Sequence, residues 1–173
     1  RSHSDEARDS LNQAMRRVAA IAVVHDTLSE GLTQNVDFDG VFDRVLKLIT
    51  EVASTHNTKA HPTFTGSFGV LPSEYATPLS LALTELVTNA VEHGLVGREG
   101  NVEISAERSE ETLTVQVRDN GGGLPEGKVG SGLGTQIVRT LIQGELGGTI
   151  DWHTMVGSGT EVTIEIPLTW LTK

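Results

Sequence analysis

An amide and a carboxylate at helical spacing stand out among the residues of this chain that could do chemistry. Glu85, Asn89 and His93 are spaced four residues apart, so a helix would place all three side chains on one stripe. An amide oxygen suits a hard cation such as Mg²⁺, which prefers a few protein oxygens together with water and phosphate. The spacing therefore predicts a magnesium site. A solvated helix face is the alternative for this run taken alone.

Three glycine-rich segments follow this run along the chain. Glycine permits positive φ and a close approach of the backbone to a ligand, and N–H groups at a helix start favour phosphate. Asp119 precedes the first segment and could accept a hydrogen bond from an exocyclic amine. Each segment alone is typical of a turn, but together they predict a magnesium-nucleotide site. The segments are Asp119-Asn-Gly121-Gly-Gly123, Gly130-Ser-Gly132-Leu-Gly134 and Gly157-Ser-Gly159-Thr160.

The order and spacing of these four segments resemble the N, G1, G2 and G3 boxes of the GHKL ATP-binding fold, which histidine kinases, gyrase, Hsp90 and MutL share. The resemblance spans residues 70–167 and implies ATP or ADP and Mg²⁺ as ligands. It implies that Asn89 binds the metal and that Glu85 is catalytic, orienting water or the nucleophile. It also implies that Asp119 reads the adenine N6 and that Thr160 lies near the adenine. The other implied nucleotide-binding residues are His93, Gly121, Gly123, Leu124, Gly130, Gly132, Leu133 and Gly134.

Two departures from the family pattern concern the phosphate end of the site. Glu92 stands where many sensor kinases carry a Lys or Arg, so this site lacks one cation. The loop between Asp119 and Gly132 is short and contains no Phe, so the lid lacks its usual aromatic box. Both departures bear on lid closure and affinity more than on which nucleotide binds.

The elements that must position these residues can be read from hydrophobic periodicity and turn residues. Alternation predicts strands, and a helix with Ser73 as N-cap is expected to carry Glu85 and Asn89. The pattern predicts an α+β fold, a two-layer α/β sandwich with a mixed sheet and helices on one face, preceded by a dimerisation helix. The expected helices are 39–53, 73–93 and 133–146, and the expected strands are 58–65, 101–108, 112–119, 149–155 and 161–167.

Residues 5–30 form a further predicted helix whose apolar positions repeat with a period of 3.5. Such a seam needs a partner helix, so we expect a homodimer or a helical bundle. The alternative is a helix that covers its own domain. The seam residues are Leu11, Ala14, Val18, Ile21, His25 and Leu28.

This leading helix resembles the second dimerisation helix of a histidine-kinase group related to the HWE kinases. The resemblance implies a truncated dimerisation and phosphotransfer hairpin at 1–31, followed by a GHKL kinase domain at 36–173. That group carries its phosphoacceptor in an earlier H-R-x-K-N-N helix, which is absent here. We therefore expect the acceptor outside this chain, and no autophosphorylation by the chain alone. His25, with Asp26 as general base, is the rival acceptor.

The predicted function is the ATP-binding catalytic domain of a sensor histidine kinase, which passes the γ-phosphate to a histidine for relay to a response-regulator receiver domain. The resemblance carries this prediction. One alternative is a protein-serine kinase of the anti-sigma-factor type, which shares the four boxes but lacks the hairpin. Another is a nucleotide-binding regulatory module without transfer activity.

Composition narrows the class of partner. A net charge of −10 argues against nucleic-acid binding, because phosphates would be repelled. The 173 residues contain no cysteine, which excludes disulfides and thiolate metal sites and agrees with a cytoplasmic location. No run of eighteen apolar residues occurs, so we expect no membrane segment. The start lacks an initiator Met and an apolar signal region, so the chain reads as a piece of a longer protein.

Overall fold

The computed structural model describes residues 35–55, 60–90, 100–120, 133–155 and 159–168, together with single positions 7, 11, 15, 18 and 22. These five single positions are all helical, in agreement with the predicted leading helix, whose other residues lie outside the described part. The remaining elements are β1 (Asn35–Asp37), α2 (Phe38–Thr55), β2 (Ala60–Gly66), β3 (Val70–Pro72), α3 (Ser73–Asn89), β4 (Gly100–Arg108), β5 (Thr112–Asp119), α4 (Leu133–Arg139), η3 (Thr140–Glu145), β6 (Thr149–Met155) and β7 (Gly159–Pro167).

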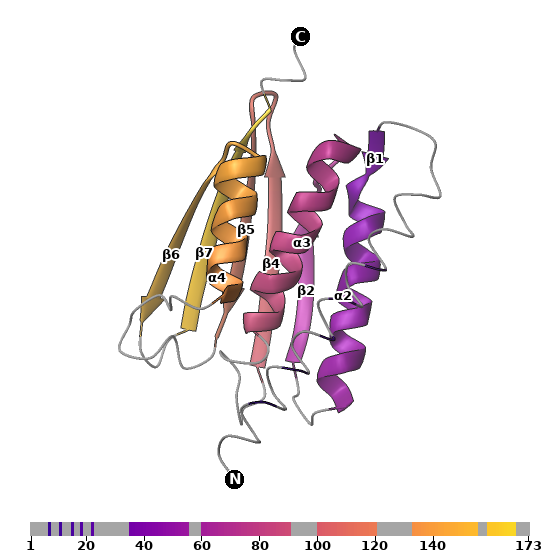
Figure 1. Ribbon diagram of the computed structural model, residues 1–173, viewed down its shortest axis with the longest axis vertical. Helices are drawn as coiled ribbons and strands as arrows, with labels where there is room; N and C mark the ends of the chain where they lie inside the picture. The colour runs from indigo at the N-terminus through magenta and orange to yellow at the C-terminus, as the bar shows by residue number, and fades with distance from the viewer. Residues whose placement is uncertain are drawn as a thin grey trace.

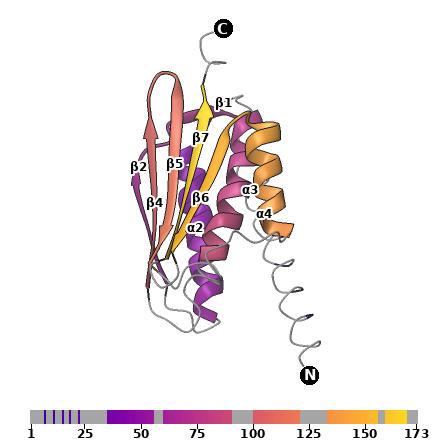
Figure 2. The same ribbon diagram turned by 90° about the vertical axis from the view of Figure 1, so that its left-hand side faces the viewer.

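Five strands form one mixed sheet in the order β2-β4-β5-β7-β6. The β2–β4 pair is parallel, and the other pairs are antiparallel. Helices α2, α3 and α4 all lie on one face of this sheet (Figures 1 and 2). The structure thus confirms the predicted α+β sandwich of two layers.

The strands alternate between a buried inner face and a polar outer face, as predicted. On β5, Leu113, Val115 and Val117 are buried under the helices, while Thr114 and Gln116 point to the other side. The same alternation runs along β4 and β7. One hydrophobic core therefore lies between the sheet and the helices, and the outer face of the sheet is polar.

All four phenylalanines of the chain gather in one cluster at α2 and β2. The ring centroids of Phe38 and Phe68 are 4.7 Å apart with the rings edge to face, and those of Phe42 and Phe64 are 5.5 Å apart in the same geometry. Such edge-to-face pairs are favoured over face-to-face sandwiches. The cluster fixes α2 against the start of the sheet. Helix α2 begins one residue before and ends two residues after the predicted 39–53.

One local prediction was wrong, and two short strands were missed. Ser73 is not the N-cap of α3: Pro72 takes that position with φ −59° and ψ 147°, and no side chain caps the helix. The reason is that the chain enters α3 directly from β3, which ends at Pro72 and pairs with β1 in a small antiparallel sheet. The sequence analysis missed both of these three-residue strands. The predicted end of this helix at His93 lies outside the described residues.

The predicted helix at 133–146 is present but changes its hydrogen bonding midway. After α4 it continues as the π-helical η3, and Leu146 N donates to Leu141 O at 3.0 Å. Gly147, with φ +64°, ends it as predicted. Among the described residues, no helix has the length and apolar character needed to cross a membrane.

Candidate nucleotide-binding site

The described parts of the segments singled out by sequence lie at one end of the sandwich. Helix α3 ends, β5 ends and α4 begins at the lower end of the molecule in Figure 1. The strand register agrees, because Arg118 near the end of β5 pairs with Glu161 near the start of β7. Asp119 pairs with Val102 near the start of β4. This end of the sheet, on its helix-covered face, is the candidate site.

Helix α3 brings Glu85 and Asn89 to this end. Glu85 is buried, with 7% of its surface exposed, and it takes part in an interaction with another group. Asn89, one turn later at the end of the helix, is partly exposed. A buried carboxylate contradicts the alternative of a solvated helix face, because acids are rarely buried without a partner or a function.

The polar side chains that precede Glu85 on α3 are satisfied within the helix. Ser80 Oγ donates to Ala76 O at 2.7 Å, and Thr84 Oγ1 donates to Ser80 O at 2.7 Å. Both hydroxyls are buried, so these bonds remove the cost of unpaired polar groups in the core. Among the described residues of α3, Glu85 is therefore distinguished as a charged side chain that is buried.

Asp119 ends a row of apolar side chains on the inner face of β5. It follows Leu113, Val115 and Val117 at two-residue spacing, and 6% of its surface is exposed. Like Glu85, it interacts with another group. A carboxylate at the end of such a row can accept a hydrogen bond from the polar edge of a ring.

Gly159 is required by its contact with the Asp119 backbone. It has φ +98°, and a Cβ built on it would lie 2.1 Å from Asp119 O and 3.2 Å from Asn120 Cα. Any other residue would force β5 and β7 apart at this point. From sequence, the Gly157–Thr160 segment taken alone was read as a hairpin turn. The antiparallel pairing of β6 and β7 agrees with that reading, and the contact with Asp119 gives Gly159 a role at the site end as well.

Thr160 is held by a residue that the sequence analysis missed. The two hydroxyl oxygens lie 3.1 Å apart, within hydrogen-bond distance, across the β6–β7 pair, where Thr160 and Thr154 stand opposite each other. Both are partly buried, and Thr154 follows Ile150 and Trp152 on the inner face of β6. The only signal in the sequence was a polar residue at an inner-face position of an alternating strand.

The outer face behind the site carries a charged cross-strand pair. Arg118 Nε and Nη2 donate to Glu161 Oε2 at 3.1 and 2.9 Å. A shallow polar depression lies beside this pair, on the face away from Asp119 and Thr160, so it is distinct from the candidate site. It is lined by Thr63, Thr65, Glu103, Ile104, Ser105, Gln116 and Arg118.

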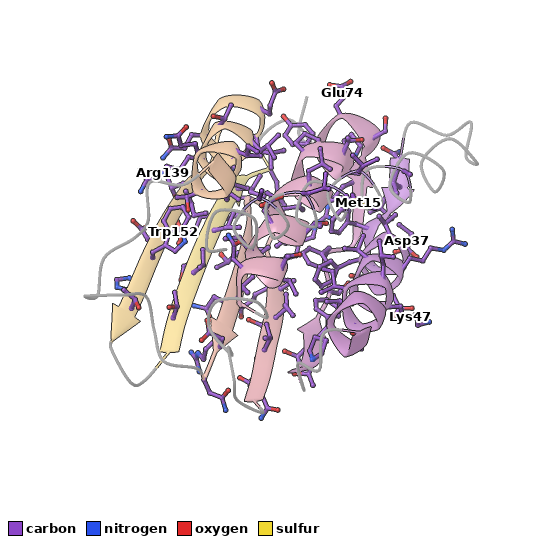
Figure 3. All side chains as sticks on the ribbon, turned by 60° about the horizontal axis from the view of Figure 1, so that its bottom comes forward. Met15, Asp37, Lys47, Glu74, Arg139 and Trp152 are labelled. Carbon is purple, nitrogen blue, oxygen red and sulfur yellow. The ribbon has the colours of Figure 1, made fainter. Side chains whose placement is uncertain are left out.

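Trp152 contacts both the core and a cation. It packs against the hydrophobic core, and the guanidinium carbon of Arg139 lies 5.1 Å from its ring centroid. Figure 3, which brings the site end forward, shows the two side chains together at the β6 edge.

Several predicted site residues lie outside the described part of the chain. They are His93, Gly121, Gly123, Leu124, Gly130 and Gly132. Leu133 and Gly134 open α4, at the same end as Asp119. Within the described ranges, no group of three or more His, Cys, Asp or Glu side chains could hold a metal ion. An amide such as that of Asn89 suits Mg²⁺ bound largely by water and phosphate, which needs few protein ligands.

Comparison with protein families gives two matches. The family described as "Histidine kinase-, DNA gyrase B-, and HSP90-like ATPase" matches residues 74–169. A family described as "Histidine kinase" matches residues 1–53.

Similar proteins and structures carry histidine-kinase names. The chain is 42% identical to the sensor histidine kinase PdtaS of Mycolicibacterium smegmatis over 97% of its own length and 34% of that protein. It is 41% identical to blue-light-activated histidine kinase 2 of Erythrobacter litoralis over 57% of this chain and 29% of that protein. The chain thus spans about a third of the length of these relatives. The histidine kinase domain of the E. litoralis EL346 kinase superposes with a TM-score of 0.75 at 28% identity, covering 90% of this chain and 74% of that one.

Proposed function

Because this chain belongs to the histidine kinase-, DNA gyrase B- and HSP90-like ATPase family, we propose that it is the ATP-binding catalytic domain of a sensor histidine kinase. The γ-phosphoryl group of ATP would pass to a histidine and then to a response-regulator receiver domain. The match of residues 1–53 to a histidine-kinase family supports this over a protein-serine kinase or a non-catalytic module. The division into a hairpin helix at 1–31 and a kinase domain at 36–173 is part of the proposal.

The observation that carries the proposal is the meeting of Asp119, Gly159 and Thr160 at the site end of β5 and β7. Asp119 would accept a hydrogen bond from the adenine N6 amine, and this would select adenine over guanine. The Thr160 hydroxyl would lie beside the same amine, directly or through a water molecule. Gly159 keeps the two strands close enough for both side chains to reach one ring.

The phosphates of the nucleotide would lie against α3 and the start of α4. The Asn89 amide oxygen would bind Mg²⁺, which when bound neutralises phosphate charge. Glu85 would orient the attacking imidazole, since positioning supplies much of the rate in phosphoryl transfer. The first N–H groups of α4, at Leu133 and Gly134, would face phosphate. The remaining proposed contacts are His93, Gly121, Gly123, Leu124, Gly130 and Gly132.

The acceptor histidine, the cytoplasmic location and the absence of bound nucleic acid stay predictions. We propose that the acceptor lies in another segment or subunit, and that His25 is not phosphorylated.

Calorimetry with Mg-ATP and Mg-GTP tests the proposed site. Asp119→Asn should weaken ATP binding and reduce the preference for ATP over GTP, because the amide presents N–H groups beside the adenine amine. Asn89→Ala should remove the magnesium dependence of binding while the circular dichroism spectrum stays unchanged. Asp151→Asn, the same charge change on the exposed side of β6, is the matched control and should bind like the wild type. Unchanged ATP affinity in both site variants would refute the site.

A further inference from the structure

We propose that Asn120 is a positioning residue whose side chain closes the ladder between β4 and β5 and thereby holds the Asp119 carboxylate in the direction that reads the base. The inference rests on the proposed function, because it takes Asp119 to accept a hydrogen bond from the adenine amine. It assigns a role to a side chain that contacts no nucleotide in this proposal and acts through its neighbour.

The first step is the hydrogen bonding between Asn120 and Asn101, which lie one position beyond the Val102–Asp119 pair at this end of the β4–β5 ladder. In an antiparallel hydrogen-bonded pair, the two residues exchange two backbone N–H···O bonds. One bond here is of that kind, because Asn120 N donates to Asn101 O at 3.3 Å. In the other, Asn101 N donates to the side-chain oxygen Oδ1 of Asn120 at 2.8 Å. The Asn120 side chain thus takes the place of its own backbone carbonyl.

The second step is the polarity of this side-chain bond, which the backbone donor settles. Because Asn101 contributes an N–H, the group that receives it must be the oxygen of the Asn120 amide and not its NH₂. The side chain of Asn101 takes no part in either bond. The contact therefore requires an oxygen on the side chain at position 120 and a backbone N–H at position 101.

The third step is the position of Asp119 between this contact and β7. The Asp119 side chain is buried on the inner face, where β5 ends. On the β7 side, a Cβ on Gly159 would lie 2.1 Å from Asp119 O, so that strand packs directly against the peptide group that joins Asp119 to Asn120. On the β4 side, the two bonds to Asn101 hold the same peptide group and the residue after it. The backbone at Asp119 is thus held from both neighbouring strands, and with it the direction in which the carboxylate leaves β5.

A purely structural role for the Asn120 side chain makes a different prediction. If the bond only closed the end of the sheet, its loss would lower stability and would weaken the binding of all nucleotides alike. If the bond holds Asp119, its loss weakens the binding of a base with an exocyclic amine more than that of a base without one. The ratio of the two affinities distinguishes these roles, because effects on the phosphates cancel in it.

The test compares Mg-ATP with the magnesium complex of purine riboside triphosphate, which lacks the exocyclic amine, by calorimetry on the full chain. Asn120→Ala should lower the preference for ATP by about 2–10-fold, the range that the loss of one hydrogen bond produces. Asn120→Asp keeps an oxygen on the side chain and should retain the wild-type ratio, since its added charge acts on both nucleotides equally. Asn101→Ala is the matched control, and it should retain the ratio because it keeps the backbone N–H.

Two further measurements address the donor of this bond. Asn101→Pro has no N–H and should lower the ratio as Asn120→Ala does, and combining the two changes should have no further effect. In Asn120→Ala, the Asn101 amide should exchange with deuterium faster than in the wild type, because it has lost its acceptor. Asn120→Leu serves as the second variant without an oxygen if melting shows that Asn120→Ala fails to fold.

The outcomes separate this inference from the proposed function. A wild-type chain that prefers ATP, loses this preference in Asp119→Asn and keeps it in Asn120→Ala would overturn the role of Asn120 alone. Equal changes of the ratio in Asn120→Ala and Asn120→Asp would overturn it too, since only one of these variants removes the oxygen. A wild-type chain that binds neither nucleotide would overturn both the inference and the proposed function.

Discussion

Gly159 is the residue at which the geometry of the site leaves least room. Replacing it by Ala would put a Cβ against the Asp119 carbonyl and force positive φ on a residue that disfavours it. Backbone strain of this kind costs about 1–3 kcal/mol. We expect Gly159→Ala to lower stability by at least that amount and to weaken ATP binding, because Asp119 must move. Thermal melting and calorimetry measure the two effects.

Gly144→Ala is the matched control for this prediction. A Cβ on Gly144 meets nothing within 4 Å, and the residue lies within η3. Alanine is favoured over glycine in a helix by about 0.5–1 kcal/mol. The control should therefore be neutral or slightly stabilising. If both alanine variants behaved alike, the contact between Gly159 and Asp119 would not constrain the site.

Some residues of the proposed site could be identified from the sequence, and others could not. Asn89 and Asp119 were identified because each stands in a local pattern, a helical stripe or a strand followed by glycines. The contact between Thr154 and Thr160 was missed because it depends on which residue of β7 stands opposite Thr154. Register between two strands is set by the hydrophobic pattern of both strands and by the turn that joins them, so it cannot be read from the seven residues of one strand.

At the level of elements, the start of α2 is joined to the turn after β2 by side-chain bonds. Asp39 Oδ1 accepts from Phe68 N at 2.8 Å, and its Oδ2 accepts from Ser67 Oγ at 2.6 Å. From the other side, Arg108 Nη1 donates to Phe68 O at 2.8 Å and Val70 O at 2.7 Å. The buried Phe68 ring is thereby held in the aromatic cluster from both ends of the turn.

Removing Asp39 should loosen this connection. Asp39→Ala leaves a partly buried Phe68 N–H without its acceptor, which costs about 1–3 kcal/mol in the free energy of unfolding. Asp43→Ala is the control in the same helix. Asp43 pairs with Lys47 at 3.0 Å with both side chains more than half exposed, and exposed pairs contribute about 0–1 kcal/mol. Urea denaturation should therefore show a larger loss of unfolding free energy in Asp39→Ala than in Asp43→Ala. Equal losses in the two variants would contradict the role of Asp39 in holding the turn.

Elements differ in how well they could be predicted. The long strands β4 and β5 were located within one residue, because each offers four or more alternating positions. The strands β1 and β3 have three residues each, too few for any period to be visible. Their pairing also displaced the predicted cap at Ser73. Short elements of this kind depend on contacts far along the chain.

At the scale of the whole molecule, the leading helix presents an apolar surface that the described domain leaves exposed. Leu11, Met15 and Val18 are 61–65% exposed, although large apolar side chains favour burial. We expect these positions, with Ile21 and Leu28, to pair with a second copy of the chain. Burial contributes roughly 1.5–3 kcal/mol per large side chain, against an association cost of roughly 4–15 kcal/mol. The dimer should therefore be weak.

Sedimentation of three proteins measures this self-association. The whole chain should dimerise at high concentration, whereas Ile21→Glu should remain monomeric because it buries a charge in the seam. A version that begins at Thr33 should also be monomeric, and it keeps β1, whose pairing with β3 the domain retains. Monomers throughout, up to high concentration, would contradict the dimer and reduce the helix to a cover for its own domain.

The order of the strands makes the two sides of the proposed adenine site unequal in their exchange with solvent. Asp119 lies on β5, the middle strand, whose backbone amides are hydrogen-bonded within the sheet on both sides. Thr154 lies on β6, an edge strand that pairs on one side only. Amide deuteration proceeds through local opening, which needs least free energy at edges. The amides around Asp119 should therefore exchange slowly and those around Thr154 faster, and a nucleotide bound at the proposed site should slow the exchange of β6 most.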